Sequence, residues 1–407
     1  MSKLAIFGGE PIRKKPFQYL PDYDEKEEKA VMDVFRTRVL SGFHKSYRTG
    51  GPKVMEFEDK FSKYHNMNYA VAFNSGTAAL HAGLVALGVT KGDEVIVPSY
   101  TFTATASSVL MCNAIPIFCD VNKDTFNVNT ENIRSLITKK TKAIIPVHLV
   151  GNPCDMGPII EIANEYNIKI LEDCAQSPGA KYKGKLVGTI GDIGAFSFVE
   201  TKNMVTGEGG MIITNNSDYN DICRLVRSHG EILVSGGRSY LSKILGWNYR
   251  MTEFEAAIGI EQLKKLESLN KYRILNTQYL DKGINFDGIS KLKIPNQSYS
   301  VAHVCPLLFD ENKVGVTRDV FLKALNAEGI EADKGYPHPL YMNPIFLNND
   351  EGKYYKGMNP IAEDLCSKSA IWIRKIMYPN NFEDMQDIIN GFTKVMENVD
   401  SLKSLEN

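Results

Sequence analysis

The residues of this chain best suited to chemistry are an acid, Asp173, and a lysine, Lys202, about thirty positions further on. Asp173 closely follows an apolar run that begins at Ile168, and Lys202 lies between a second apolar run and the glycine-rich segment Gly207-Glu-Gly-Gly210. A carboxylate at the end of a strand and a lysine in a loop are the two groups that a pyridoxal phosphate enzyme requires. The lysine forms a Schiff base with the cofactor's aldehyde, and the acid keeps the pyridine nitrogen protonated so that the ring can accept electrons. The pair therefore predicts pyridoxal 5'-phosphate as a cofactor.

Both residues also have simpler interpretations. Asp173 could cap a following helix, and a single lysine in a loop is usually a solvated charge. The apolar runs on either side of the Lys202 loop, however, would bring the lysine to the edge of a sheet, where its charge must be paired or lost. A lysine whose pKa is lowered in this way is the nucleophile and proton shuttle that imine chemistry needs. The neighbouring Cys174 is interpreted as a small packing residue.

Four further residues could surround such a cofactor. Gly76 lies where a strand passes into a helix, so free amides and the helix dipole could bind an anion there, although for this segment taken alone an ordinary Ser N-cap is the favoured explanation. Ser197 could add a hydroxyl to a phosphate group. Gln176 could hydrogen-bond the cofactor's phenolic oxygen or simply occupy a turn, and Phe102 could stack on the ring or belong to the core.

Short apolar runs alternate with helical patterns between about residue 70 and residue 215. The alternation predicts βα units, and the near-continuous hydrophobicity of the runs is typical of strands covered on both faces by helices. We expect an α/β fold, a three-layer α/β/α domain around a mostly parallel seven-stranded sheet. Because only the lysine loop joins the last two strands, one of them is expected to run antiparallel. The runs are 70–73, 94–97, 116–119, 143–147, 168–171, 195–198 and 210–214.

The rest of the chain predicts two further parts. Residues 1–50 are polar and loop-rich with one helix over 25–36, and a long helical pattern covers 252–269. Strands and helices then mix in a smaller α+β unit. We therefore expect an N-terminal arm (1–50), a large cofactor-binding domain (51–275) and a small C-terminal domain (276–407).

Composition excludes several classes of protein. A formal net charge of −1 over 407 residues argues against nucleic acid and anionic membranes as partners. No apolar run is long enough for a signal peptide or a membrane span. The seven scattered cysteines include no Cys-x-x-Cys pair, which predicts reduced thiols in a cytoplasm, and the seven single histidines predict no metal site. The motifs of P-loop, nucleophile-elbow, dinucleotide-binding and His-Glu-x-x-His enzymes are also absent.

Ordered segments of one family's pattern run through nearly the whole chain, and together they resemble the DegT/DnrJ/EryC1/StrS sugar aminotransferases of the fold-type I pyridoxal phosphate superfamily. The segments are Phe7-Gly-Gly-Glu-Pro11, Gly51-Pro-Lys-Val-Met-Glu-Phe-Glu58, Asn74-Ser-Gly-Thr77, Gly92-Asp-Glu-Val-Ile-Val-Pro-Ser99, Pro146-Val-His-Leu149, Glu172-Asp-Cys-Ala-Gln176, Gly207-Glu-Gly-Gly210, His229-Gly230, Asn248-Tyr-Arg-Met-Thr252 and Gly335-Tyr-Pro-His-Pro-Leu-Tyr341.

The resemblance implies a fold-type I aminotransferase-like architecture and a role for each matching position. Lys202 would be the Schiff-base lysine, Asp173 the partner of the pyridine nitrogen and Gln176 the contact to the phenolic oxygen. The remaining cofactor contacts would be Gly76, Thr77 and Ser197 to the phosphate, Phe102 stacked on the ring, and Asn248 reaching the phosphate from a second subunit. The asparagine implies a homodimer with shared active sites.

The chain also departs from the family's pattern. Val199 stands where many members carry histidine, so the donor or acceptor preference could differ. Some relatives replace the lysine with histidine and act as dehydratases, whereas this chain keeps Lys202.

These observations predict a cytoplasmic homodimeric aminotransferase with a ping-pong mechanism. Glutamate or glutamine would donate the amino group, and a keto-sugar, usually nucleotide-linked, or a keto-cyclitol would accept it. The alternatives are a pyridoxal phosphate-dependent sugar dehydratase on the same scaffold and a non-catalytic cofactor-binding regulator, although the acid–lysine pair is intact. Candidate substrate contacts are Tyr336, His338, Tyr341 and Arg238.

Overall fold

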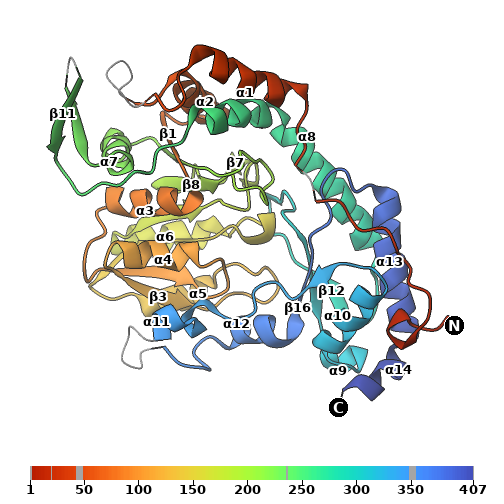
Figure 1. The fold of residues 1–407 in the computed structure, drawn as a ribbon. Coiled ribbons are helices and arrows are strands. Elements are labelled where there is room, and N and C mark those ends of the chain that lie inside the picture. The colour runs from red at the N-terminus through yellow and green to blue at the C-terminus, as the bar shows by residue number, and fades with distance from the viewer. Residues whose placement is uncertain (1, 20, 43–48, 235–236, 348–353, 407) are drawn as a thin grey trace.

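A seven-stranded sheet forms the centre of the molecule in the computed structural model, which describes residues 2–19, 21–42, 49–234, 237–347 and 354–406 (Figure 1). The strand order is β1-β9-β8-β5-β4-β2-β3, and the neighbours are parallel except where β9 pairs with β1 and β8. The predicted mostly parallel sheet is confirmed, and β9 is the reversed strand. The strands are β1 (Tyr69–Phe73), β2 (Glu94–Pro98), β3 (Ile115–Cys119), β4 (Thr141–Ile144), β5 (Lys169–Asp173), β8 (Ile193–Ser197) and β9 (Gly210–Thr214).

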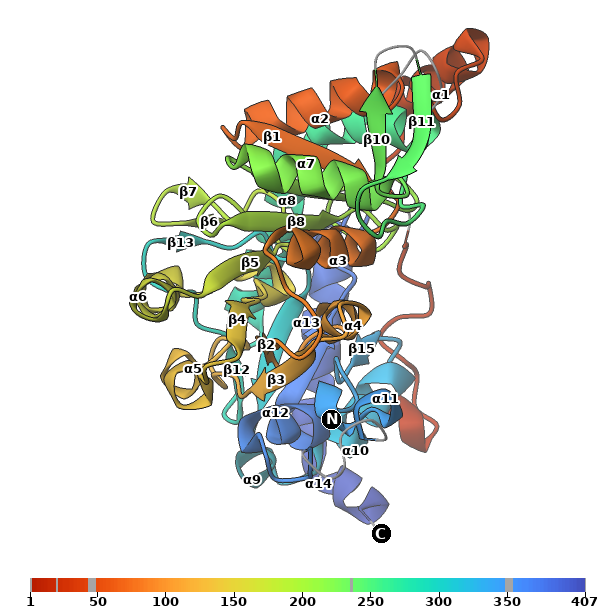
Figure 2. The ribbon, with the colours of Figure 1, turned by 90° about the vertical axis from the view of Figure 1, so that its left-hand side faces the viewer.

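Helices cover both faces of this sheet because its buried strands direct alternate apolar side chains to opposite sides. Val95 faces the core beneath α3 and α4, whereas Ile96 faces the core beneath α5 and α6. Figure 2 shows α3 and α4 on one side of the sheet and α5 and α6 on the other. The helices are α2 (Pro52–Tyr64), α3 (Gly76–Ala86), α4 (Ala104–Met111), α5 (Thr130–Leu136), α6 (Met156–Tyr166) and α7 (Ser217–Arg227).

A single helix of 31 residues, α8 (Glu253–Gly283), connects this domain with the C-terminal part (Figure 1). Its first turns pack beside α2 and the sheet, and Leu280 near its end lies in the C-terminal core. The helix is longer than the predicted 252–269, and the expected domain boundary at 275 lies inside it. Polar side chains end the apolar periodicity, yet Asn270, Arg273 and Asn276 are buried because backbone carbonyls accept their hydrogen bonds.

The C-terminal part is an α+β unit, as expected. Its four-stranded antiparallel sheet has the order β12-β14-β16-β15. The elements are β12 (Ile289–Lys291), β14 (Cys305–Phe309), α9 (Glu311–Val314), α10 (Arg318–Ala327), β15 (Ala332–Asp333), α11 (Pro344–Leu347), α12 (Pro360–Asp364), β16 (Ala370–Ile373), α13 (Phe382–Glu397) and α14 (Val399–Leu402).

Short elements complete the chain. A small sheet joins β13 (Ser298–Tyr299), β6 (Lys181–Tyr182) and β7 (Lys185–Leu186), and β10 (Glu231–Val234) pairs with β11 (Gly237–Ser242) in a hairpin that projects beside α7 (Figure 1). Single helical turns lie at Ala5–Phe7, Leu149–Gly151, Leu340–Met342, Leu365–Ser369 and Lys403–Leu405.

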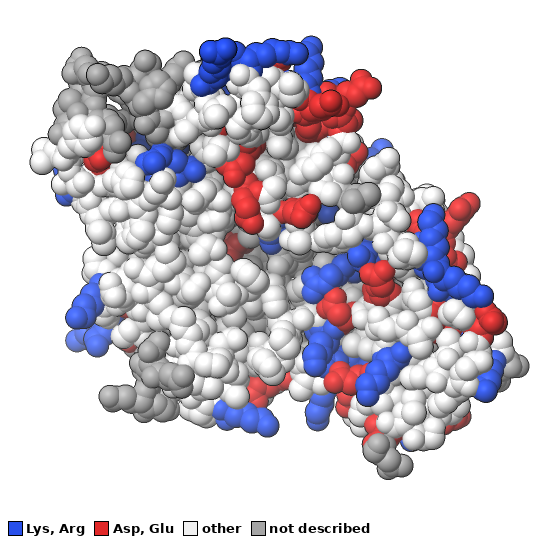
Figure 3. All heavy atoms as spheres, in the orientation of Figure 1, with Lys and Arg blue, Asp and Glu red and all other residues white. Residues whose placement is uncertain are grey.

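The N-terminal arm packs along both parts of the molecule. Its helix α1 (Glu25–Thr37) lies on α8, and the preceding residues reach the C-terminal core, where Glu328 accepts a hydrogen bond from the Ala5 amide at 2.7 Å. In the orientation of Figure 3, charged side chains gather over α1 and the C-terminal elements, and the face over α3 and α4 is largely uncharged. Within the described ranges, no helix combines the length and the apolar character that crossing a membrane requires.

Candidate active site

A cavity of about 550 Å³ opens at the C-terminal ends of the parallel strands, where α/β sheets place ligands. Asp173 ends β5, Ser197 ends β8, and α3 begins at Gly76 shortly after β1. These three residues and Lys202 all line the cavity, which has the size of a small-molecule site, about 300–1,000 Å³. The fold thus brings together residues that lie far apart in the sequence.

The carboxylate of Asp173 is held in a fixed position in the cavity wall. The residue is 4% exposed, its Oδ2 accepts a hydrogen bond from the Thr105 hydroxyl at 2.8 Å, and its Oδ1 accepts one from the Ala175 amide at 3.1 Å. Burial raises the pKa of Asp173, and these hydrogen bonds and the charge of Lys202 oppose the rise. A buried carboxylate of this kind is stabilised by a cationic partner, which a protonated pyridine nitrogen would supply.

The amine of Lys202 is the counterpart of this acid. Removal from bulk water lowers the pKa of Lys202 to about 8, against the opposing effect of Asp173 and with a further lowering by Arg374. Among the described residues, its Nζ has no hydrogen-bond partner or ion-pair partner. A half-buried, unpartnered amine that loses its proton near neutral pH is chemically a nucleophile.

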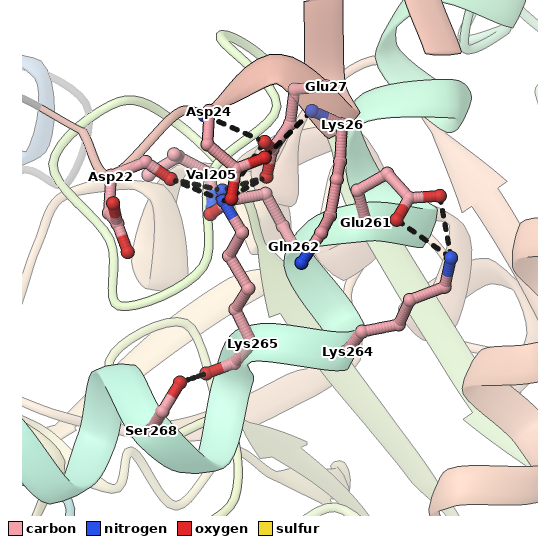
Figure 4. Close-up of polar contacts among 10 residues, drawn as sticks. All are labelled: Asp22, Asp24, Lys26, Glu27, Val205, Glu261, Gln262, Lys264, Lys265 and Ser268. Atoms are coloured by element: carbon pink, nitrogen blue, oxygen red, sulfur yellow. Dashed lines mark hydrogen bonds and ion pairs between the residues drawn. The ribbon is translucent and has the colours of Figure 1, made fainter. Parts of the chain in front are cut away.

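The loop that carries Lys202 is anchored from helix α8 (Figure 4). Gln262 accepts a hydrogen bond from the Val205 amide at 3.5 Å, and its Nε2 donates to the Asp22 carbonyl at 2.9 Å and to Glu27 at 2.8 Å. Glu27 also pairs with Lys265 at 2.9 Å. One glutamine therefore connects the lysine loop, the long helix and the N-terminal arm.

The N-terminus of α3 forms another part of the cavity wall. Ser75 caps the helix by accepting a hydrogen bond from the Ala78 amide at 3.1 Å, so the N-cap interpretation is correct. The first amides of a helix nevertheless lack intrahelical partners and can bind an anion. A Cβ at Gly76 would lie 2.7 Å from the Cβ of Ser197, so only glycine lets the helix start this close to the serine. Gly76, Thr77 and Ser197 thus form a polar part of the cavity wall, in which Gly76 and Ser197 lie close together.

Gln176 and Phe102 complete the expected ring contacts. Gln176 accepts a hydrogen bond from the Val150 amide at 2.7 Å and donates to the Tyr336 hydroxyl at 3.0 Å, which leaves one amide hydrogen for a ligand. Phe102 is 56% exposed on the cavity wall, and this exposure excludes the core interpretation.

Of the four residues expected to contact the substrate, only Tyr336 is among the described lining residues of the cavity. Tyr336 lines the cavity, whereas the exposed His338 is not among its described lining residues. Tyr341 is buried in the core beneath α3 and α4 and contacts Glu363, so it is a packing residue here. Arg238 belongs to β11, and its side chain lies outside the described residues.

Asn248 also lies outside the described lining of its own cavity. It is exposed, and its carbonyl accepts a hydrogen bond from Asn74 at 3.4 Å. Its expected contact from a second subunit stays a prediction.

Three cavity residues were not singled out from the sequence. Thr105, at the start of α4, follows the aromatic Phe102 by one helical turn. His303 and Arg374 come from the C-terminal part, and Arg374 directly follows the buried strand β16. The strand-end position that draws attention to Asp173 would also have found Arg374.

Comparison with known proteins decides the family. The model of the DegT/DnrJ/EryC1/StrS aminotransferase family matches residues 23–392. The chain belongs to this family. It is 39% identical to the GDP-perosamine synthase of Caulobacter vibrioides over 330 residues, 81% of this chain and 86% of that protein.

Two further similarities extend over nearly the full length. The chain is 31% identical to a putative L-glutamine:3-amino-2,3-dideoxy-scyllo-inosose aminotransferase of Streptoalloteichus tenebrarius, covering 99% of this chain and 100% of that protein. A putative sugar aminotransferase from Streptococcus pneumoniae, solved in a PMP form, has a TM-score of 0.85 and 28% identity, with 96% of this chain and 100% of that chain covered.

Family membership makes the chain a pyridoxal phosphate-dependent sugar aminotransferase and confirms the resemblance seen in its sequence. The residues present fit the cofactor. Lys202 offers an unpartnered amine, Asp173 offers a buried carboxylate, and a Cβ at Gly76 would crowd Ser197 at the N-terminus of α3, where a phosphate is expected.

Proposed function

We propose that this member of the family transfers the amino group of glutamate or glutamine to the keto group of a nucleotide-linked sugar or a cyclitol, with Lys202 and Asp173 as its catalytic residues. The observation that carries the proposal is the unpartnered amine of Lys202, with its lowered pKa, in the same cavity as the buried carboxylate of Asp173.

Each cavity residue has a defined task in this proposal. When bound, pyridoxal phosphate supplies an electron sink next to the reacting carbon. Asp173 holds the proton on the ring nitrogen, and its hydrogen bonds from Thr105 and Ala175 keep the carboxylate in place. Lys202 holds the cofactor and carries protons to and from the reacting carbon, which its lowered pKa permits near neutral pH.

The other cavity residues bind and orient the cofactor. Gly76, Thr77 and Ser197 would hold the phosphate through backbone amides and a hydroxyl, because they lie at the N-terminus of α3. Phe102 would cover the ring, and Gln176 would donate its remaining amide hydrogen to the phenolic oxygen.

The names of the relatives support the substrate classes. One is a GDP-perosamine synthase, whose product name indicates a nucleotide-linked amino sugar, and another is named as an L-glutamine-dependent aminotransferase of a scyllo-inosose. The proposed acceptor class therefore includes both kinds of keto compound.

The proposal includes a homodimer with shared active sites. Each subunit would consist of an arm (1–50), a large domain (51–275) and a small domain (276–407). Its support is the position of Asn248 outside its own cavity, the 75% exposure of Leu245 nearby, and the largely uncharged face over α3 and α4 (Figure 3). Because all seven cysteines are free and buried, we propose the reducing cytoplasm as the compartment.

The test is the visible absorption of the purified protein before and after L-glutamate is added. We expect a cofactor band that shifts to the pyridoxamine form with wild-type protein, and no such conversion with Lys202→Ala or Asp173→Asn, each shown by circular dichroism to be folded. Normal turnover by Lys202→Ala would refute the proposed mechanism. Product analysis addresses the dehydratase alternative, because a transaminase adds nitrogen to the sugar and a dehydratase removes oxygen.

A further inference from the structure

Arg273, on helix α8, carries a buried positive charge for which the described part of the chain provides no negative partner. The residue is 6% exposed, and its one hydrogen bond runs from Nη1 to the His303 carbonyl at 3.0 Å. Among the described residues, no carboxylate forms an ion pair with it. Arginine is almost never buried without a partner, because the charge loses its hydration. We therefore expect a group from outside the described chain to balance this charge.

The other buried arginines of the described chain show what is missing. Each of these three pairs with at least one carboxylate. The pairs are Arg13 with Asp384 and Asp387 at 2.8 and 2.7 Å, Arg227 with Glu58 at 2.6 Å, and Arg318 with Asp319 at 2.9 Å. In contrast, burial lowers the pKa of Arg273 to about 10 with no nearby carboxylate to oppose the effect. Arg273 is thus the exception among the buried arginines that the structure describes.

A second cavity, of about 40 Å³, lies beside Arg273. Its wall combines α8 with the N-terminal arm, the loop that carries Lys202, and the segment Met377–Tyr378. Nε and Nη2 of Arg273 have no acceptor among the described residues, yet neither atom is sealed from solvent. These N–H groups can therefore reach a small ligand in this cavity, which we call the Arg273 cavity.

The size and the chemistry of the Arg273 cavity fit a small anion. One water takes about 10–15 Å³, so 40 Å³ accommodates a monatomic ion with a water or two, but no sugar or nucleotide. Tyr19 and Thr201 line the cavity, and burial raises the pKa of Tyr19, so its hydroxyl keeps a proton to donate. Asp22 and Glu200 also line the cavity, but neither pairs with Arg273, and Glu200 is exposed to solvent.

We propose that the Arg273 cavity binds a small monovalent anion such as chloride, held by the guanidinium of Arg273 and the hydroxyls of Tyr19 and Thr201. The anion balances the buried charge and connects α8, the N-terminal arm and the Lys202 loop. This site differs from the expected phosphate site, because Gly76, Thr77 and Ser197 are not among the described residues that line it.

Urea unfolding of the cofactor-loaded protein measures the effect of the anion. At constant ionic strength, sodium chloride replaces sodium 2-morpholinoethanesulfonate, whose anion is too large for a cavity of 40 Å³. When chloride reaches about ten times its dissociation constant, the folding equilibrium of wild type should shift about tenfold toward the folded state. Arg273→Gln should show no such shift. Arg13→Gln, which removes a buried arginine with its own carboxylate partners, is the matched control and should respond to chloride as wild type does.

Two further readouts distinguish an anion site from a general effect of salt. Without chloride, Arg273→Gln should be at least as stable as wild type, because glutamine removes an unbalanced buried charge. With chloride, limited proteolysis of the N-terminal arm should slow in wild type and in Arg13→Gln but not in Arg273→Gln, because only an occupied site connects the arm to α8.

Bromide locates the ion directly and needs no variant that folds. Crystals of the wild-type protein grown in sodium bromide should show an anomalous peak within hydrogen-bond distance of the Arg273 guanidinium. The absence of a peak there would overturn the proposal and leave water as the content of the cavity. The same conclusion would follow if wild-type stability did not depend on chloride, or if Arg273→Gln responded to chloride as strongly as wild type.

Discussion

Replacing Lys202 with methionine in the cofactor-free protein should change the way its stability depends on pH. In the folded protein the pKa of this lysine is lowered from 10.5 to about 8, chiefly because its amine leaves bulk water. The unfolded chain restores the ordinary value, so between these two pKa values the unfolded state binds more protons. The wild-type protein therefore gains stability relative to the variant as the pH rises through this window. Since each tenfold change in proton affinity is worth about 1.4 kcal/mol, the full effect is about 3 kcal/mol.

Urea unfolding of both proteins at several pH values measures this difference. At about pH 7 the lysine is charged in both the folded and the unfolded state, so burying its charge destabilises wild type relative to Lys202→Met by the full amount of about 3 kcal/mol. By about pH 9.5, about 2 kcal/mol of this destabilisation should have disappeared. Other titrating groups, such as the buried thiols, cancel because both proteins contain them. Lys140→Met, at an exposed position, controls for exchanging a lysine for methionine. A difference between wild type and Lys202→Met that stays constant over this range would refute the reasoning.

Three further substitutions test the cavity and its anchors. Gly76→Ala would place a Cβ 2.7 Å from the Cβ of Ser197, so pyridoxal phosphate titrated into the protein should bind at least about tenfold more weakly; unchanged affinity would contradict the phosphate site. Thr105→Val removes a hydrogen bond to the buried Asp173, which should lower the free energy of unfolding by about 1–3 kcal/mol in urea, and an unaffected value would show that the bond contributes nothing. Gln262→Leu breaks the contacts to the arm and the lysine loop, so limited proteolysis should cut the N-terminal arm faster than in wild type; equal rates would show that other contacts hold the arm.

Local sequence rules located the part of the site that belongs to the large sheet. Asp173 and Lys202 flank short buried strands, and parallel strands end at one edge, so their meeting could be predicted. His303 and Arg374 reach the cavity because the C-terminal part packs against that edge. The strand-end position of Arg374 marks it as a candidate, but the long-range packing that brings it to this edge leaves no periodic signal in the sequence.

The length of α8 was underestimated for a related reason. Periodicity assigns polar residues to the solvent side, but Asn270 and Asn276 are buried and donate hydrogen bonds to carbonyls of neighbouring segments. A rule that uses only apolar spacing ends the helix where its partners change from apolar side chains to backbone oxygens. The predicted domain boundary at 275 followed from that rule.

Because α8 runs unbroken between the two parts, it sets the rotational phase between them. One residue inserted near its middle would turn everything beyond it by about 100° and advance it by about 1.5 Å. Leu263 and Leu280 could then no longer face their separate cores at the same time. Four inserted residues would return the phase to within about 40°. The number of residues in this helix therefore fixes the relative orientation of the two parts and so keeps Lys202 and Arg374 in one cavity. Changes in chain length should be better tolerated in the surface loops.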